Sequence, residues 1–196
     1  MPIMRRFLIA LLATLTLGST AMAAETKTAI FAGGCFWCMQ PVFDNTDGVL
    51  KTEVGYTGGT VANPTYEQVI SDTTGHYEAI RVTYDPAKVS YDTLLEHYWE
   101  NIDPLDAGGQ FADQGEHYHT IIFVADDAQR AAAEASREKV AAKFAPRKVA
   151  TQIRPAKPFY PAEDYHQKYY QKNAMRYNAY KYGSGRVGRL KELWSD

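Results

Sequence analysis

The apolar residues of the chain follow two different periodicities, which alternate along the sequence. Short apolar and β-branched runs predict buried strands at 26–32, 49–56, 76–85, 119–124 and 149–154. Apolar residues at helical spacing predict helices between these runs, from 35 to about 45 and at 63–70, 90–99 and 126–144. Strands that alternate with helices through connections of mixed length indicate an α/β fold, in the form of a two-layer α/β sandwich.

Turn and capping residues refine these boundaries. Asn63 suits a helix N-cap and Pro64 the first helical position, while Ser90 suits the N-cap of the next helix. A polar, glycine-containing stretch at 103–115 predicts a loop of about a dozen residues, and loops of that length are more often functional than idle. The turn-rich residues 182–196 predict an irregular tail that wraps the surface.

The N-terminus has the pattern of an export signal. Arg5 and Arg6 precede an uncharged run at 7–18, and a signal peptidase site with small residues follows at 21–23. The apolar run holds roughly 12 residues, whereas a membrane span needs about 20. We therefore expect a signal peptide at 1–23 and no membrane span. The alternative is an uncleaved N-terminal anchor.

Charge and length limit the possible partners and the number of domains. The chain has 196 residues, with 21 Lys and Arg against 23 Asp and Glu, and a formal net charge of -2. Loss of residues 1–23 takes away two arginines and no acid, which brings the formal charge to -4. Nucleic-acid-binding proteins usually carry a basic domain or stripe, so we expect no nucleic-acid partner. Residues 24–196 contain no repeat or long linker, and their length fits a single domain.

The two cysteines indicate a reactive site. They are too few for a disulfide-stapled scaffold, and a bridge between them would close a short loop that stabilises little. Cys35 follows Gly33 and Gly34 at the junction of a predicted strand and helix, where free N–H groups and the helix dipole lower a thiol pKa. We therefore expect Cys35 to be a thiolate nucleophile. Cys38 shares its helix face and is near enough to bridge it.

Other interpretations of this segment remain open. Phe36 and Trp37 can form an apolar pocket for a methyl group or thioether beside the thiol, or both rings can belong to the core. A zinc site would need partners such as His117 and His119. A thioredoxin-like disulfide oxidoreductase is the main rival as an enzyme. A c-type haem would require histidine directly after the second cysteine, where Met39 stands.

Around Cys35 the chain resembles the A-type peptide methionine sulfoxide reductases. Its most specific motif is GCFW at 34–37, and the whole resemblance extends from about 28 to 183. Six further segments agree with that family in order and spacing. They are VGYTGG at 54–59, NPTY at 63–66, TGHYEA at 74–79, YDP at 84–86, QFADQG at 110–115 and FYPAEDYHQ at 159–167.

The resemblance implies a set of site residues. The cysteine of the Gly-Cys-Phe-Trp motif is the nucleophile in the family, and it falls on Cys35. A glutamate and two tyrosines surround the sulfoxide oxygen there, an aspartate in the long loop supports them, and two aromatic residues hold the methyl group of the substrate. In this sequence those positions are Glu78, Tyr66, Tyr118, Asp113, Phe36 and Trp37.

The residue types alone support these roles less strongly. Tyr66 and Tyr118 are two of fourteen tyrosines, and without the resemblance each would be assigned to the core or the surface. Glu78 opens a predicted strand and would usually be a solvated carboxylate. A glutamate among aromatic rings can nevertheless stay protonated and act as an acid, because its charged form is disfavoured there.

The chain departs from the common family pattern at two positions. Many members have glycine at the position of Cys38 and recycle through cysteines near the C-terminus, which this chain lacks. Cys38 is then the residue that resolves a Cys35 sulfenic acid, and a thioredoxin-like donor reduces the resulting disulfide. Many members also have glutamate at Gln40, so this chain carries one charge fewer at the start of the helix.

The resemblance implies a mixed sheet with packed helices in ferredoxin-like, split βαβ topology. We expect a monomeric enzyme without cofactor or metal that reduces the S epimer of methionine sulfoxide, free or in peptides and proteins. The expected location is a periplasm, since an exported reductase needs an outside source of electrons, or else the medium. The alternatives are a general disulfide oxidoreductase and an exported metal-binding module.

Overall fold

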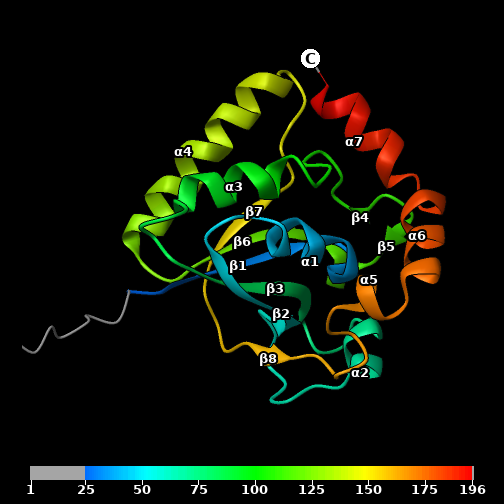
Figure 1. Cartoon of the computed structure of the whole chain (residues 1–196). Helices are drawn as coiled ribbons and strands as arrows, with labels where there is room; N and C mark the ends of the chain where they lie inside the picture. The colour runs from blue at the N-terminus through cyan, green and yellow to red at the C-terminus, as the bar shows by residue number, and fades with distance from the viewer. Residues whose placement is uncertain (1–24, 196) are drawn as a thin grey trace, which may run out of the picture.

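Six strands form one mixed sheet in the computed structural model, which describes residues 25–195 of the chain (Figure 1). The strands are β1 (Lys27–Gly33), β2 (Val49–Thr57), β3 (Tyr77–Tyr84), β6 (Thr120–Val124), β7 (Gln152–Pro155) and β8 (Tyr160–Pro161). Their order across the sheet is β7-β6-β1-β3-β2-β8. A separate hairpin consists of β4 (Gly109–Gln110) and β5 (Asp113–Gln114).

Helices cover the sheet and extend along one side of it. They are α1 (Phe36–Asp44), α2 (Tyr66–Ile70), α3 (Tyr91–Trp99), α4 (Asp127–Phe144), α5 (Tyr169–Lys172), α6 (Ala174–Gly183) and α7 (Arg186–Trp194), with a 3-10 turn η1 (Glu116–Tyr118). The helices α5, α6 and α7, orange to red in Figure 1, run beside the hairpin. Within residues 25–195, no helix combines the length and apolarity needed to cross a bilayer. The predicted signal peptide at 1–23 lies outside the described residues.

The pairing of the strands is mixed. β1 is antiparallel to both β3 and β6, and β2 is antiparallel to β3. β1 and β2 therefore run in the same direction with β3 between them, and α1 connects them. β6 and β7 are parallel, and α4 is the crossover between them. The predicted α/β class with a mixed sheet and packed helices is confirmed, whereas the ferredoxin-like topology stays a prediction at that level of detail.

The main core lies between the sheet and the helices α1, α3 and α4. Phe31 of β1 stacks on Phe43 of α1, with 5.3 Å between ring centroids, and on Tyr98 of α3, with 5.0 Å. The buried Tyr98 hydroxyl donates to the Ala32 carbonyl at 2.8 Å, as a buried polar group requires. These contacts fix the end of β1 relative to the helices, and Cys35 lies just beyond that end.

The predicted start of the second helix is wrong. Helix α2 begins at Tyr66 and not at Pro64, because Thr65 is its N-cap. The Gln68 N–H donates to the Thr65 side chain, and the Gln68 side chain accepts from the Thr65 N–H at 2.9 Å. This reciprocal capping box satisfies two backbone donors. Asn63 instead takes a left-handed φ of 46°, which a short polar residue tolerates.

The C-terminal segment that was predicted to be irregular is helical. Helix α6 ends at Gly183, Gly185 takes a left-handed φ of 78°, and α7 then runs to Trp194. Helix α7 contains Gly188, which weakens the helical signal in the sequence. Its Leu193 packs into the main core. Tertiary packing therefore stabilises α7 where its own helix propensity is low.

Candidate active site

The turn between β1 and α1 places Cys35 at the N-cap of α1. Gly34 adopts a left-handed φ of 73°, and a Cβ at this position would lie 2.5 Å from the Cβ of Gln110. The Gln110 amide is fully buried, where it donates to the Asp103 carbonyl and accepts from the Asp103 N–H, each at 2.8 Å. The loop predicted at 103–115 therefore packs on this turn, and that close approach requires glycine before Cys35.

The sequence suggested that the free N–H groups at the start of α1 would face the Cys35 sulfur. In the structure the carboxyl of Glu78, from β3, lies there instead. Its Oε2 accepts the Phe36 N–H at 3.0 Å, and the side chain is only 1% exposed. Burial raises the pKa of Glu78 to about 8, the charge on Asp113 adds to this, and the Phe36 N–H acts in the opposite direction. Glu78 therefore holds a proton at neutral pH, in agreement with the expectation for a glutamate among aromatic rings.

The expected lowering of the Cys35 pKa is contradicted. Burial, a hydrogen bond to Cys38 and the charge on Glu78 raise the pKa of the Cys35 thiol well above its usual value. The reason is that the first free N–H of α1 is directed to the Glu78 carboxyl, while the sulfur lies in a buried position. A thiol here needs a neighbouring group to take its proton before it can act as a nucleophile.

Cys38 lies against Cys35, and both cysteines are free thiols. The hydrogen bond from Cys35 lowers the pKa of Cys38 to about 7, and the charge of Arg186 acts in the same direction against burial. Arg186, at the start of α7, is 3% exposed and donates to the Asn101 carbonyl at 2.6 Å and to the Gly33 carbonyl at 3.2 Å. The predicted proximity of the two sulfurs is confirmed, because Cys35 and Cys38 interact directly.

Tyr66 and Tyr118 lie together beside Cys35 and Glu78. Tyr66 starts α2 and Tyr118 ends η1, and the two side chains lie close enough for Tyr118 to oppose the rise in the pKa of Tyr66. Burial raises the pKa of both tyrosines, and the charges on Glu78 and Cys35 add to this. Both tyrosines remain protonated at neutral pH, so each can donate a hydrogen bond to an oxygen bound next to the sulfur.

Phe36 and Trp37 have different environments. Phe36 is buried in a cluster with Tyr56, at 6.0 Å between ring centroids. Trp37 is half-buried and stacks on Tyr169 at 3.8 Å, and its Nε1 donates to Nδ1 of His166 at 2.9 Å. Trp37 thus forms a wall of the cleft, and Phe36 belongs to a buried cluster against which Trp37 and Tyr66 pack, so its predicted role at the methyl group stays a prediction.

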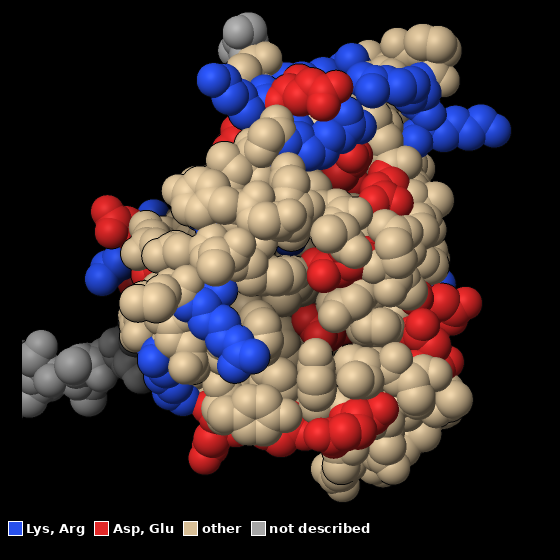
Figure 2. All heavy atoms as spheres, turned by 90° about the vertical axis from the view of Figure 1, so that its right-hand side faces the viewer, with Lys and Arg blue, Asp and Glu red and all other residues tan. Residues whose placement is uncertain are grey.

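An aromatic cleft opens beside these residues. It has a volume of about 390 Å³, and its lining residues are Trp37, Tyr66, Tyr165, His166, Tyr169, Arg176 and Tyr180. This side of the molecule, where α2, α5 and α6 lie, is mostly uncharged in its middle, and Lys and Arg gather at the α7 end (Figure 2). Such a cleft suits an apolar side chain with one polar atom.

Several residues of the site were not predicted. His166 and Tyr169 contact Trp37, while Tyr177 and Tyr180 lie beside the two cysteines, which raise the pKa of both tyrosines. His166 falls within the segment at 159–167, which was a signal for its position. The spacing of the two tyrosines places them on one helix face, but no local pattern in the sequence directs that face toward the cysteines.

The histidines considered for zinc do not form a metal site. Nδ1 of His117 lies 2.5 Å from Asp72 Oδ1, and His119 lies beside Tyr77. Among residues 25–195, no three His, Cys, Asp or Glu side chains converge so that they could hold a metal ion.

Gln40 connects three elements. Its Nε2 donates to Thr52 Oγ1 of β2 at 3.1 Å, and its Oε1 accepts the N–H of Lys168, before α5, at 2.7 Å. An amide can donate and accept at once, whereas a carboxylate can only accept. Glutamine at position 40 can therefore make both of these contacts, whereas a glutamate could only accept the N–H of Lys168.

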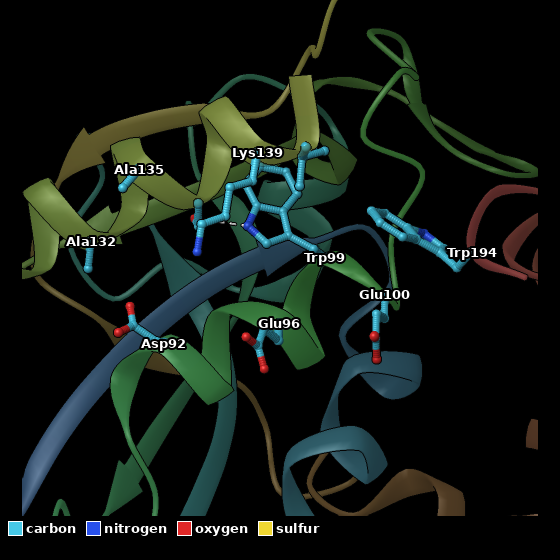
Figure 3. Close-up of a pocket in the computed structure, with 10 residues that line it drawn as sticks. Asp92, Glu96, Trp99, Glu100, Ala132, Ala135, Lys139 and Trp194 are labelled. Carbon is cyan, nitrogen blue, oxygen red and sulfur yellow. Dashed lines mark hydrogen bonds between the residues drawn. The ribbon is translucent and has the colours of Figure 1, made fainter. Parts of the chain in front are cut away.

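A second cavity, of about 520 Å³, lies between α3 and α4 (Figure 3). Asp92, Glu96 and Glu100 lie along one wall, Lys139 lies across from them on α4, and Trp194 lies at the end near Glu100 (Figure 3). None of the predicted site residues lines this cavity. The residues predicted for the site therefore gather at the β1–α1 turn and not at this cavity.

Comparison with known proteins agrees with this arrangement. The sequence model described as peptide methionine sulfoxide reductase matches residues 27–196. Peptide methionine sulfoxide reductase MsrA of Bacillus pumilus is 52% identical over 176 residues, which are 89% of this chain and 99% of the relative. Peptide methionine sulfoxide reductase MsrA 2 of Caulobacter vibrioides is 51% identical over 195 residues, which are 97% of this chain and 99% of the relative.

A solved structure extends the similarity to the fold. Mxr1 from Saccharomyces cerevisiae in reduced form has a TM-score of 0.73 and 29% sequence identity, over 78% of this chain and 88% of that chain. The family model and the two relatives each cover most of the chain. This chain therefore belongs to the peptide methionine sulfoxide reductase family.

Proposed function

We propose that this chain reduces the S epimer of methionine sulfoxide, free or in peptides and proteins, to methionine. The observation that carries this function is the contact of three kinds of group at one point. A thiol at Cys35, a carboxyl that holds its proton at Glu78 and the hydroxyls of Tyr66 and Tyr118 lie together beside an aromatic cleft. A sulfoxide needs a nucleophile for its sulfur and proton donors for its oxygen.

The proposed reaction begins at the sulfoxide sulfur. Cys35 attacks it as the thiolate, Glu78 gives its proton to the oxygen, and Tyr66 and Tyr118 donate hydrogen bonds to that oxygen. The protonated oxygen then moves as a hydroxyl from the substrate sulfur to the Cys35 sulfur while the bond between the two sulfurs breaks, so that methionine leaves as the thioether and Cys35 is oxidised to a sulfenic acid. Trp37 and the cleft beside it would hold the methyl group, and Asp113 supports the network through its charge at Glu78.

Cys38 completes the cycle. Its sulfur attacks the Cys35 sulfenic acid, water leaves, and a Cys35–Cys38 disulfide remains, which a thioredoxin-like protein dithiol reduces. The thiolate is the attacking form, and the positive charge of Arg186 favours it at Cys38.

A direct test uses peptides that contain one sulfoxide epimer. We expect the wild-type chain to reduce the S epimer and to leave the R epimer unchanged, with methionine quantified by mass spectrometry. A general disulfide oxidoreductase would instead reduce insulin disulfides readily and produce no methionine. That result would exclude the proposed function.

Replacement of Cys38 by serine separates the two halves of the cycle. We expect Cys38→Ser to form about one methionine per chain in a single turnover and then to stop with a protein dithiol as donor, because nothing resolves the sulfenic acid. Rapid-quench measurement of methionine and dimedone labelling of Cys35 would follow both events. Normal steady-state turnover of this variant would show that Cys38 has no resolving role.

The activity should depend on pH through Glu78. Its folded-state pKa of about 8 means that the proton needed for the sulfoxide oxygen is present below this pH and is lost above it. We expect the single-turnover rate of Cys38→Ser to fall as the pH rises through about 8. A rate that continues to increase up to pH 10 would contradict an acid role for Glu78.

We also propose that the chain is exported to a periplasm and acts there as a monomer. The pattern of 1–23 supports export, and a signal peptidase site at 21–23 predicts a mature N-terminus at Ala24. Mass spectrometry of the purified protein tests the cleavage. Light scattering at several concentrations tests the oligomeric state.

A further inference from the structure

Two residue pairs with the same spacing, two cysteines at the start of α1 and two tyrosines on α6, lie opposite each other. Cys35 and Cys38 lie at the start of α1, and Tyr177 and Tyr180 lie three residues apart on α6. Tyr180 lies close enough to Cys35, and Tyr177 to Cys38, for each cysteine to raise the pKa of its tyrosine. Residues three apart share a helix face, so α6 supplies one hydroxyl to each sulfur. The Tyr180 ring also meets Trp37 edge-on, at 6.1 Å between centroids.

The Tyr180 hydroxyl has a second partner. It donates to Oδ2 of Asp113, in β5 of the hairpin that packs beside α6. A tyrosine hydroxyl has a single proton, so when that proton lies toward Asp113 the oxygen can only accept from the Cys35 thiol. When the Cys35 proton turns from Cys38 toward Tyr180, the three groups form a continuous chain from Cys35 Sγ–H to Tyr180 Oη–H and on to Asp113 Oδ2.

We propose that Tyr180 and Asp113 together remove the proton from Cys35 when the thiol becomes a nucleophile. The Cys35 S–H bond breaks as its proton moves to Tyr180 Oη, and the original Tyr180 proton moves to Asp113 Oδ2. A thiolate and a neutral Asp113 result, Tyr180 ends as it began, and no group is oxidised or reduced. This step rests on the proposed function only for its timing, because it describes the thiol before any substrate reacts.

The surroundings of Cys35 show why such a route is needed. The titratable groups around the sulfur are Cys38, Glu78, Tyr66, Tyr118, Tyr177 and Tyr180, with Asp113 and Arg186 behind them. Glu78 is protonated and serves as the acid, so it cannot also be the base. Asp113 is the carboxylate that remains, and burial raises its pKa, which makes it a better proton acceptor. Cys38 is the other possible acceptor.

The experiment measures the thiol itself. All variants carry Cys38→Ser, so that Cys35 is the only cysteine and Cys38 cannot take its proton. We expect Tyr180→Phe to lower the rate of Cys35 alkylation by iodoacetamide at pH 7 by about tenfold, and to shift the midpoint of its pH profile upward. The phenylalanine keeps the ring beside Trp37. Tyr182→Phe is the matched control, because Tyr182 lies on the same helix and is 67% exposed.

The variant Asp113→Asn separates proton transfer from simple electrostatics. Loss of a negative charge alone would favour the thiolate and speed alkylation, whereas the proton route predicts slower alkylation. The double variant Tyr180→Phe/Asp113→Asn should react no more slowly than either single variant, because both changes interrupt one route. Thermal unfolding of each variant checks that the fold is retained.

Two outcomes would overturn the proton route. One is an unchanged pH profile in Tyr180→Phe, and the other is faster alkylation in Asp113→Asn. Slower alkylation in both variants supports the route even if the wild-type chain fails to reduce methionine sulfoxide, so this result is independent of the proposed function.

Discussion

Replacement of Cys35 by serine is expected to lower the rate of sulfoxide reduction by roughly 10⁴-fold or more. A serine hydroxyl at this position has no base strong enough to ionise it, and an alcohol oxygen does not displace oxygen from sulfur as a thiolate does. Even the single turnover should disappear, since the first bond of the reaction forms at this sulfur. Substrate binding should persist, because the cleft is lined by aromatic side chains rather than by Cys35.

The measurement is methionine formed from a single-epimer sulfoxide peptide under single-turnover conditions. The matched comparison is Cys38→Ser, which also exchanges one buried sulfur for oxygen but should retain the first turnover. Equal loss in both serine variants would indicate damage to the fold rather than removal of the nucleophile. Methionine formation by Cys35→Ser at an undiminished rate would refute the assignment of the nucleophile.

Glu78→Gln is expected to have two opposite effects, of which the first is on activity. The amide keeps an oxygen that can accept the Phe36 N–H, but it has no proton to give to the sulfoxide oxygen. We expect a loss of roughly 10²–10⁴-fold in the single-turnover rate, the usual range for a general acid. The decline in rate above pH 8 should disappear with it, because glutamine does not titrate.

The second effect is on stability. The folded-state pKa of Glu78 is about 8, above the ordinary value of 4.5, so the folded chain binds this proton more tightly than the unfolded chain. The stability associated with the protonated carboxyl is complete below about pH 4.5 and is lost as the pH rises toward 8. The loss from this buried group amounts to roughly 3–5 kcal/mol.

We therefore expect Glu78→Gln to gain stability relative to wild type as the pH rises from 4.5 to 9. Urea unfolding at a series of pH values measures the difference directly. Glu25→Gln is a suitable control, because Glu25 is exposed and lies 3.9 Å from the Lys27 ammonium in a loose ion pair. A difference between Glu78→Gln and wild type that is independent of pH would show that Glu78 does not titrate as assigned.

Sequence periodicity located the strands and the longest helix because their signal is local. Residues 126–144 were predicted as a helix, and α4 spans Asp127–Phe144 with Asp126 as its cap. The predicted strand at 49–56 corresponds to β2. An alternating or helical pattern needs no distant partner to be recognised, since it reflects which face of each element becomes buried.

Elements with weak local signals were found only in the structure. Helix α7 contains Gly188, and it is held by Leu193 in the core and by Arg186 against the β1–α1 turn. The hairpin of β4 and β5 consists of two-residue strands, too short for any periodicity. These segments owe their conformation to contacts with residues far away in the sequence.

The candidate site divides along the same line. The glycine pair before Cys35 and the position of Cys38 one helical turn later were apparent in the sequence, and they determined which sulfurs meet. The protonation state of those sulfurs was not apparent in the sequence, which predicted a lowered pKa for Cys35. The fold raises that pKa. A pKa depends on the groups that surround the atom, and Glu78 reaches it from a strand more than forty residues away.

The chain sequence by itself therefore determined the fold class, the reactive cysteine pair and, through its motifs, the family. The tertiary structure determined the electrostatics: that Glu78 holds its proton, that Tyr180 of α6 lies beside Cys35 and donates to Asp113, and that Arg186 of α7 reaches the β1–α1 turn. Patterns of side chains along an element are local properties of a sequence. Burial, charge and hydrogen-bond partners arise when distant segments meet, and they become apparent only in the folded chain.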